Sequence, residues 1–234
     1  MEVLNRLLFD IEQLARPEHA EILSRFFKTG PGQYGDGDLF LGVKVPPLRS
    51  CAVRYARLLT LSEMEWLLNR PEHELRLVAL LMLVYRYERA SCADQGREIV
   101  DLYLRNSTRI NNWDLVDLSA YKILGPHCAS VGPELLYTLA GSGFLWEERM
   151  SIIATLHFIR NRKFDVTLNI SRSLMHHKHD LIHKAVGWMI REVGKRDFDS
   201  AFSFVREHYK VMPRTMLRYA IERYPEEVRR ELMR

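Results

Sequence analysis

The stretch HKAVGWMIREV at residues 183–193 decides the fold, because a basic residue leads an apolar run whose members recur with helical spacing. Comparable stretches are ERMSIIATLHF at 148–158, RTMLRYAIERY at 214–224 and LRLVALLML at 75–83. Alternating strand-like patterns are nearly absent, and the chain has only 12 Gly and 9 Pro. We therefore predict an all-α fold, with short helices between breakers such as the pair at 125–126.

The basic residues that lead these stretches recur at a regular interval. Arg149 and Lys184 are 35 residues apart, Lys184 and Arg218 are 34 apart, and Arg76 precedes Arg149 by 73, about two intervals. This period predicts an α-α superhelix of HEAT-like repeats, with residues 1–234 as a single domain. Equivalent positions would form a basic stripe along a concave groove that suits DNA. Alternatively, the basic residues simply coat a solvated helix face.

The composition narrows the class of protein. Of 234 residues, 47% are hydrophobic and 27% charged, which allows a large core, and the formal net charge is only +4. No run is long and apolar enough for a membrane helix, and the N-terminal stretch carries acids where a signal peptide would be apolar. The cysteines at 51, 92 and 128 suggest neither disulfides nor a zinc site. We expect a cytoplasmic protein with no membrane partner.

The motif INNWDLVDLSAYKILG at 110–125 carries the most distinctive side chains. Trp113 and Asp117 are four residues apart and share one helix face, with Asp114 about a quarter-turn away. Two further segments are WEERMSIIATL, which carries Arg149, and AVGWMIREVGK, which carries Trp188. On pattern alone, the tryptophans could be core residues, and Asp117 could form an ordinary ion pair.

Together these segments resemble the AlkD-type DNA alkylation repair glycosylases, a family of HEAT-like repeat proteins, over nearly the whole chain from about Pro17 to about Arg223. The resemblance implies that Asp117 is the catalytic carboxylate and that Trp113 and Trp188 flank the damaged nucleotide. It also implies hydrolysis of the N-glycosidic bond of cationic N3- and N7-alkylated purines in duplex DNA, as in base excision repair. Family members work on this nucleotide within the duplex, without a base-specific pocket.

The residue types suit that chemistry. An N3- or N7-alkylated purine is already a cation, so it departs as a neutral base and needs no general acid. Positive charge develops on the sugar instead, and a carboxylate in a partly desolvated cleft stabilises that charge and can orient water. The indole faces of Trp113 and Trp188 attract cationic groups by about 0.5 to 2 kcal/mol each.

Duplex binding needs several phosphate contacts that release counterions. The expected DNA-binding residues are Arg149, Lys184, Lys195, Arg214, Arg218 and Phe26, with Arg160, Arg162 and Lys163 as secondary candidates. At the position of Phe26 some family members carry a Tyr that reaches toward DNA. Phe26 keeps the aromatic ring but lacks the hydroxyl group of that Tyr. The partner is double-stranded DNA with alkylated purines, bound by a monomer with no obligate protein partner.

Three features leave alternatives open. The histidines at 176, 177, 179 and 183 have a spacing compatible with a metal, but a basic surface is the better interpretation, and we expect neither metal nor cofactor. The loop TGPGQYGDGD at 29–38 either brings backbone N–H groups to phosphate or serves as a connector. An alternative function is a noncatalytic HEAT-repeat protein that binds branched or damaged DNA, and a protein-interaction scaffold is the third.

Overall fold

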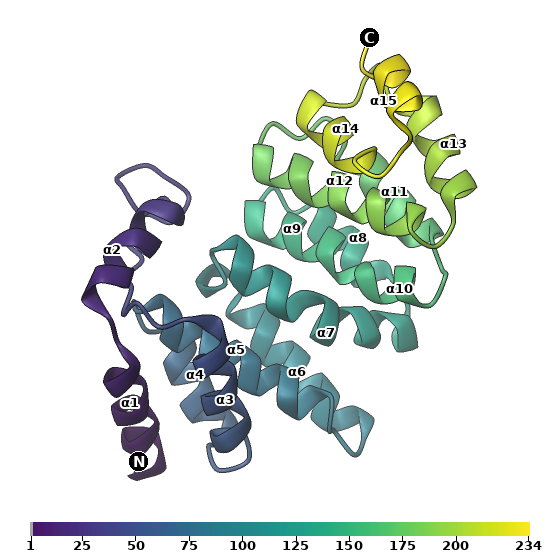
Figure 1. The fold of residues 1–234 in the computed structure, drawn as a ribbon. Helices are drawn as coiled ribbons and strands as arrows, with labels where there is room; N and C mark the ends of the chain where they lie inside the picture. Colours follow the sequence, from purple (N-terminus) through teal and green to yellow (C-terminus); the bar gives the residue numbers. More distant parts are fainter. Residues whose placement is uncertain (1) are drawn as a thin grey trace. The chain divides into compact units, whose positions relative to one another are not determined.

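The computed structural model describes residues 2–234, which form α-helices joined by short connections. Within this range there is no strand, only an isolated parallel bridge between Leu39 and Glu72. The all-α prediction is confirmed. The chain divides into two compact units, residues 1–119 and residues 120–234, and α7 (Trp113–Val131) runs from the end of the first into the second (Figure 1).

Unit 1 is built around one buried helix, α5, whose residues from His73 to Val84 are all buried. Helices α3 and α4 pack against α5, and α1 packs against α3. Helix starts follow local rules: Pro17 occupies the first turn of α2, and Thr60 forms a capping box with Glu63 at α4. Before α7, the elements are α1 (Glu2–Leu14), α2 (Pro17–Phe26), α3 (Val45–Tyr55), α4 (Leu61–Leu68), α5 (His73–Tyr87), α6 (Ala93–Arg105) and the short 3-10 turn η1 (Ser107–Arg109).

Unit 2 repeats one arrangement of paired helices. Its elements after α7 are α8 (Glu134–Ala140), α9 (Leu145–Ala154), α10 (Leu156–Arg160), α11 (Asp165–Ser173), α12 (Asp180–Gly194), α13 (Phe198–His208), α14 (Arg214–Ala220) and α15 (Glu226–Leu232). Helix α12 packs against α9 on one side and α14 on the other, so these three form one layer (Figure 1). The spacing of Arg149, Lys184 and Arg218 places one basic residue on each of them.

Helices α12 and α14 approach each other closely at Gly187. A Cβ atom added to Gly187 would lie 2.4 Å from the carbonyl oxygen of Met216 and 2.6 Å from the Cβ of Tyr219. Real Cβ atoms do not make such short contacts, so only glycine allows the two backbones to meet here. Gly187 lies in the middle of α12 between buried residues, including Val186.

Two predicted helix boundaries were wrong. Gly125 and Pro126 do not end a helix, because α7 continues through Pro126 to Val131. Gly125 instead provides room for a close contact: an added Cβ would lie 2.6 Å from the Cβ of His157 and 2.7 Å from the carbonyl oxygen of Ala154. Conversely, the stretch at 148–158 is not one helix, since α9 ends at Ala154 and α10 begins at Leu156.

The prediction of a single domain stays a prediction. No helix within residues 2–234 combines the length and the apolar character that crossing a membrane requires.

The contact at Gly187 predicts a position-specific stability change. Gly187→Ala should lower the free energy of unfolding by about 1–3 kcal/mol, because the added methyl group overpacks two adjoining helices. The matched control is Gly96→Ala in α6, where the nearest atom to an added Cβ is Tyr87 Cε2 at 3.4 Å. That change should be neutral or stabilise by up to about 1 kcal/mol. Chemical denaturation measures both, and equal effects would contradict the packing explanation.

Candidate nucleic-acid interface

Trp113 and Asp117 lie on the first two turns of α7, as the sequence predicts. The side-chain carbonyl of Asn112 accepts the backbone N–H of Trp113 at 2.9 Å, which satisfies one donor at the start of the helix. Both side chains are partly exposed. Their spacing of four residues puts an indole and a carboxylate on one face of the same helix.

The carboxylate of Asp117 acts on a buried tyrosine nearby. Burial raises the pKa of Tyr103, and the negative charge of Asp117 raises it further, whereas a hydrogen bond with Ser119 lowers it. The hydroxyl groups of Tyr103 and Ser119 are 2.9 Å apart, and the Ser119 hydroxyl donates to the carbonyl of Leu115 at 2.5 Å. The helix face below Asp117 is therefore fixed by a buried hydrogen-bonded pair.

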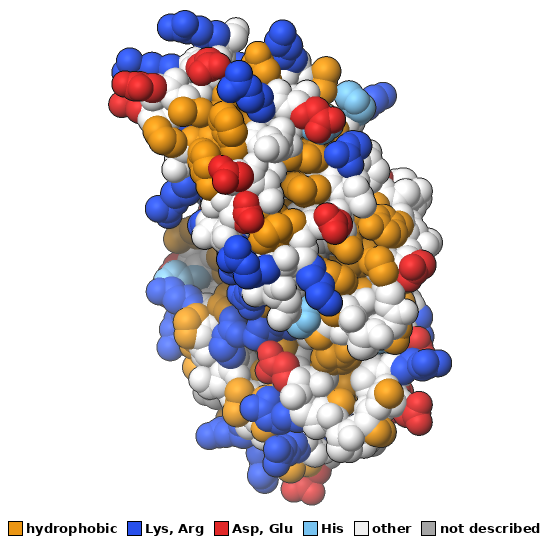
Figure 2. Space-filling view, turned by 90° about the vertical axis from the view of Figure 1, so that its right-hand side faces the viewer, with side chains coloured by type: hydrophobic (Ala, Val, Ile, Leu, Met, Phe, Trp, Pro, Cys, Tyr) orange, Lys and Arg blue, Asp and Glu red, His pale blue; other side chains and the backbone are white. Residues whose placement is uncertain are grey.

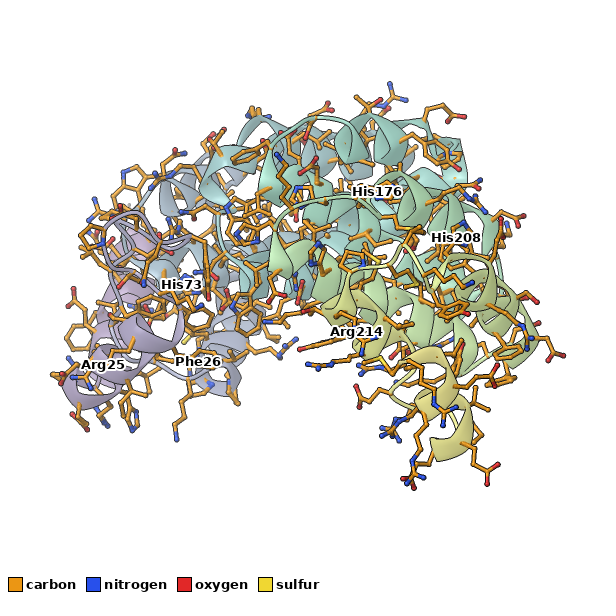
Figure 3. All side chains as sticks on the ribbon, turned by 90° about the horizontal axis from the view of Figure 1, so that it is seen from above. Arg25, Phe26, His73, His176, His208 and Arg214 are labelled. Atoms are coloured by element: carbon orange, nitrogen blue, oxygen red, sulfur yellow. The ribbon has the colours of Figure 1, made fainter. Side chains whose placement is uncertain are left out.

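Trp113 belongs to an aromatic cluster in unit 1. Its ring stacks on Phe27 with centroids 5.1 Å apart and meets the edge of Phe26 at 5.9 Å. Phe27 also packs against Phe40 at 5.2 Å, and Phe40 stacks on His73 at 4.6 Å. Phe26 is 61% exposed at the end of α2, whereas His73 lies deeper on α5 (Figure 3). Phe26 and Trp113, both predicted site residues, are thus in contact.

A buried histidine joins this cluster to two carboxylates. The side chain of His73 is 2% exposed, and its Nε2 is 2.8 Å from Asp114 Oδ2 while its Nδ1 is 3.3 Å from Asp38 Oδ2. Burial disfavours the charged ring, but the charge and hydrogen bond of Asp114, with the bond to Asp38, outweigh it and raise the pKa of His73 to about 9. His73 is therefore protonated at neutral pH and donates from both ring nitrogens.

A buried arginine completes the set of charges around Asp38. The Arg76 Nη2 atom is 2.7 Å from Asp38 Oδ1, close enough for an ion pair although poorly directed for a hydrogen bond. Burial disfavours the ionised carboxylate, but the hydrogen bond from His73 and the charges of Arg76 and His73 outweigh it and lower the pKa of Asp38 to about 2. Asp38 ends the glycine-rich loop, so this buried carboxylate anchors the loop to α5.

The neighbouring carboxylate of Glu74 holds the chain after that loop. It accepts the backbone N–H groups of Leu41, Gly42 and Val43 at 2.9, 2.8 and 3.1 Å. These three donors would otherwise lack partners in a segment without regular structure, and an ionised acceptor makes the bonds strong. Successive residues at the start of α5 therefore fix both ends of the segment from Asp38 to Val43.

A cavity of about 390 Å³ opens beside the aromatic cluster. Phe26, Phe27 and Phe40 contribute to its mostly apolar wall, and His73 and Asp114 also line it. Because His73 and Asp114 are paired with each other, the cavity offers an aromatic surface with little polar area. It lies within unit 1, next to the rings that contact Trp113.

In unit 2, Trp188 and Lys195 share one carboxylate on α12. The indole Nε1 of Trp188 donates to Glu192 Oε1 at 3.2 Å, and the Lys195 amine donates to the same oxygen at 2.5 Å. Arg196 also lies 3.2 Å from Glu192 Oε2. Trp188 is partly exposed, so its ring is oriented by this bond while one part of it reaches the surface.

The predicted DNA-binding residues of unit 2 differ in their surroundings. Arg149 on α9 is only 4% exposed, and its Nη1 donates to the carbonyl of Leu181 at 2.5 Å. Lys184 is 2.7 Å from Asp180, one turn earlier on α12. Arg214 and Arg218 on α14 are exposed, and within residues 2–234 neither forms an ion pair. Figure 3 labels Arg214. The DNA-binding roles of these four residues stay predictions.

Basic side chains on the surface are mixed with other types. On the face that Figure 2 shows, Lys and Arg side chains are interspersed with acidic and hydrophobic ones. The secondary candidates Arg160, Arg162 and Lys163 are exposed at the end of α10, and Arg160 lies over the ring of Tyr121 at 4.8 Å. His179 precedes α12 instead of lying within it, and His177 Nε2 is 2.9 Å from Glu148. The histidines are therefore used in local contacts.

Sequence reasoning missed the buried charges of unit 1. His73 and its partners Asp38 and Asp114 are separated by 35 and 41 residues, so no local spacing reveals the network. A weak signal was present, because His73, Glu74 and Arg76 precede and interrupt an otherwise apolar run, where charged groups must be paired. Lys184 follows Asp180 by four residues, and this spacing could have predicted their ion pair.

The raised pKa of His73 predicts a pH-dependent stability. Since the folded state binds this proton more tightly than the unfolded chain, the stabilisation is complete below about pH 6.5 and is lost as the pH rises through about 9. His73→Asn should remove that dependence and cost about 3 kcal/mol at pH 6.5, because it removes the buried cation that pairs with Asp114 and Asp38. Urea denaturation from pH 6 to 10, with His73 titrated by NMR, measures both.

The control for this experiment is His176→Asn, which changes an exposed histidine. It should keep the pH dependence of the unchanged protein. A titration of His73 near pH 6.5, or the same dependence in His73→Asn, would contradict the assignment of the charged imidazole.

Comparisons with known proteins identify the family and a similar fold. The sequence profile described as "DNA alkylation repair enzyme" matches residues 7–224, and no curated protein gives a significant sequence match. The chain is similar in fold to the structure of a predicted DNA alkylation repair enzyme from Enterococcus faecalis. The TM-score is 0.71 and the identity 18%, with 91% of this chain and 97% of that chain covered. Because the profile spans nearly its whole length, the chain belongs to the DNA alkylation repair enzyme family.

Proposed function

We propose that this protein is a DNA glycosylase that hydrolyses the N-glycosidic bond of cationic N3- and N7-alkylated purines in duplex DNA. Membership of the alkylation repair family supports a role in this kind of repair. The observation that carries the specific reaction is the placement of Asp117 one helical turn after Trp113, with both side chains partly exposed on one face of α7.

Asp117 would stabilise the sugar as the bond breaks. The alkylated base leaves as a neutral molecule, so the barrier lies in the oxocarbenium-like charge that develops at the anomeric carbon. A nearby carboxylate stabilises that charge and can accept a hydrogen bond from the attacking water. This role requires an ionised carboxylate.

The aromatic rings would hold the damaged nucleotide. Trp113 is supported from behind by Phe27 and at its edge by Phe26, so its ring has a fixed orientation. A fixed indole face can attract a cationic base or the C–H groups of the sugar. Trp188, oriented by Glu192, is the corresponding proposal for unit 2. Phe26 adds an exposed ring that can contact DNA without donating a hydrogen bond.

The phosphate contacts would come chiefly from exposed cations. Arg214 and Arg218 are the strongest candidates, because binding a phosphate would not first require them to leave an acidic partner. Lys184 and Lys195 would exchange Asp180 and Glu192 for phosphate, which reduces their net contribution. Arg149, being buried, would act mainly by fixing the start of α12 through the carbonyl of Leu181.

Asp117→Asn should abolish most base release while preserving DNA binding. We expect the single-turnover rate on a duplex with one N7-methylguanine to fall by about a hundredfold or more, because the neutral amide no longer stabilises the sugar cation. The measurement is release of the free base at saturating protein, with affinity for the same duplex determined separately.

The matched control is Asp101→Asn, which removes an exposed carboxylate from α6. It should release base at the rate of the unchanged protein. If the unchanged protein binds the duplex but releases no base, the noncatalytic DNA-binding alternative replaces the glycosylase proposal. If Asp117→Asn releases base at an undiminished rate, the assigned carboxylate is wrong.

Arg214→Gln and Arg218→Gln should weaken binding to undamaged duplex independently of its sequence. Each should reduce the slope of log affinity against log salt by about 1, because one fewer phosphate contact releases one fewer counterion. Fluorescence anisotropy at several salt concentrations measures the slope. Arg206→Gln, an exposed arginine on α13, should leave it unchanged. An unaltered slope in both α14 variants would remove α14 from the proposed interface.

A further inference from the structure

A second cavity in unit 1 gathers arginines at the far end of α5. It has a volume of about 420 Å³ and is lined by Arg57, Tyr85, Arg86, Arg89, Gln95 and Glu98, among others. We name it the arginine cavity. Tyr85 lies twelve residues after His73 on the same helix, which corresponds to about 18 Å along the axis. The arginine cavity is therefore separate from the aromatic cluster around Trp113.

Two of the three guanidinium groups lie over one ring, and backbone carbonyls hold the third. The guanidinium carbon of Arg89 is 3.8 Å from the centre of the Tyr85 ring, and that of Arg57 is 5.8 Å from it. Arg86 donates from Nε to the carbonyl of Ala56 at 2.6 Å and from Nη2 to the carbonyl of Leu59. These contacts orient the cations without neutralising them, because an aromatic ring and backbone carbonyls carry no net charge.

The local charge is unbalanced. Glu98 is the one acid among the residues that line the arginine cavity, against three arginines. Within residues 2–234, Arg57 and Arg86 form no ion pair within 4.0 Å, while Arg89 is 3.7 Å from Glu88. Burial lowers the pKa of Arg86, and the charge of Glu98 opposes this. The arginines that line the arginine cavity thus outnumber its one acid, and a multiply charged anion would offset this excess of positive charge.

We propose that the arginine cavity binds the phosphate group of a small phosphate monoester, such as a nucleoside monophosphate. Guanidinium groups match phosphate oxygens in geometry, and three of them suit a dianion better than a carboxylate. The volume exceeds what a phosphate group needs and lies within the usual range for small-molecule sites, about 300–1,000 Å³. Leu61 and Ile99 provide an apolar wall for the organic part of the monoester. The carboxylate of Glu98 can accept hydrogen bonds from hydroxyl or amino groups of that part.

This proposal does not rest on the proposed glycosylase activity, and its test uses no damaged DNA. Isothermal titration calorimetry would compare adenosine 5′-monophosphate, adenosine and inorganic phosphate as probes. We expect saturable binding of the monophosphate, weaker binding of inorganic phosphate and none of adenosine. The variant Arg57→Gln with Arg89→Gln should weaken the monophosphate at least tenfold, since it removes two charges but keeps the backbone contacts of Arg86.

The control is Arg97→Gln, because Arg97 is an exposed arginine of α6 that does not line the arginine cavity. This variant should bind the monophosphate with the affinity of the unchanged protein. Circular dichroism and thermal melting establish that each variant folds. NMR of the unchanged protein should show amide shifts near Tyr85 and Gln95 on adding the monophosphate. Absence of saturable binding, equal affinity in the double variant, or displacement of the monophosphate by a short undamaged DNA duplex would each overturn the assignment.

Discussion

The charged imidazole of His73 is the interaction on which the candidate site of unit 1 depends. It pairs with Asp114 at the beginning of α7 and with Asp38 at the end of the glycine-rich loop, and it stacks on the ring of Phe40. Two segments that are distant in the sequence, the chain from Asp38 to Val43 and the start of α7, therefore meet on one residue of α5. Because the ring nitrogens both donate, neither segment can shift without exposing an unpaired carboxylate in a buried region.

Buried charges of this kind contribute more to the choice of one arrangement than to stability, since desolvation offsets much of the attraction. Here the buried pair of His73 and Asp114 fixes the position of the start of α7. Asp114 follows Trp113 directly, so fixing Asp114 also fixes the indole that rests on Phe27. The carboxylate of Asp117 is one turn further on the same helix. The positions of Trp113 and Asp117 are thus determined by the buried pair of His73 and Asp114.

Unit 2 depends on close backbone packing between α12 and α14. The missing side chain at Gly187 lets α12 and α14 touch, and the cations on these helices follow from that layer. Several cations of unit 2 are used within the protein: Arg149 donates to the carbonyl of Leu181, and Lys195 donates to Glu192, which also accepts from Trp188. Arg214 and Arg218 remain exposed on α14. A count of basic residues therefore overestimates the charge available to a polyanion.

Local sequence determined the features that depend on neighbours a few residues apart. Helical spacing of apolar residues determined the all-α class, and the spacing of Trp113 and Asp117 determined that they share a face of α7, because helix geometry repeats every 3.6 residues. Tertiary structure alone decided which polar groups meet across long separations. The bridge from His73 to Asp38 and Asp114, the passage of α7 through Pro126 and the gathering of arginines around Tyr85 all depend on packing between segments. Such contacts leave no periodic trace in the sequence, since their energy comes from burial and charge pairing that exist only after the chain has folded.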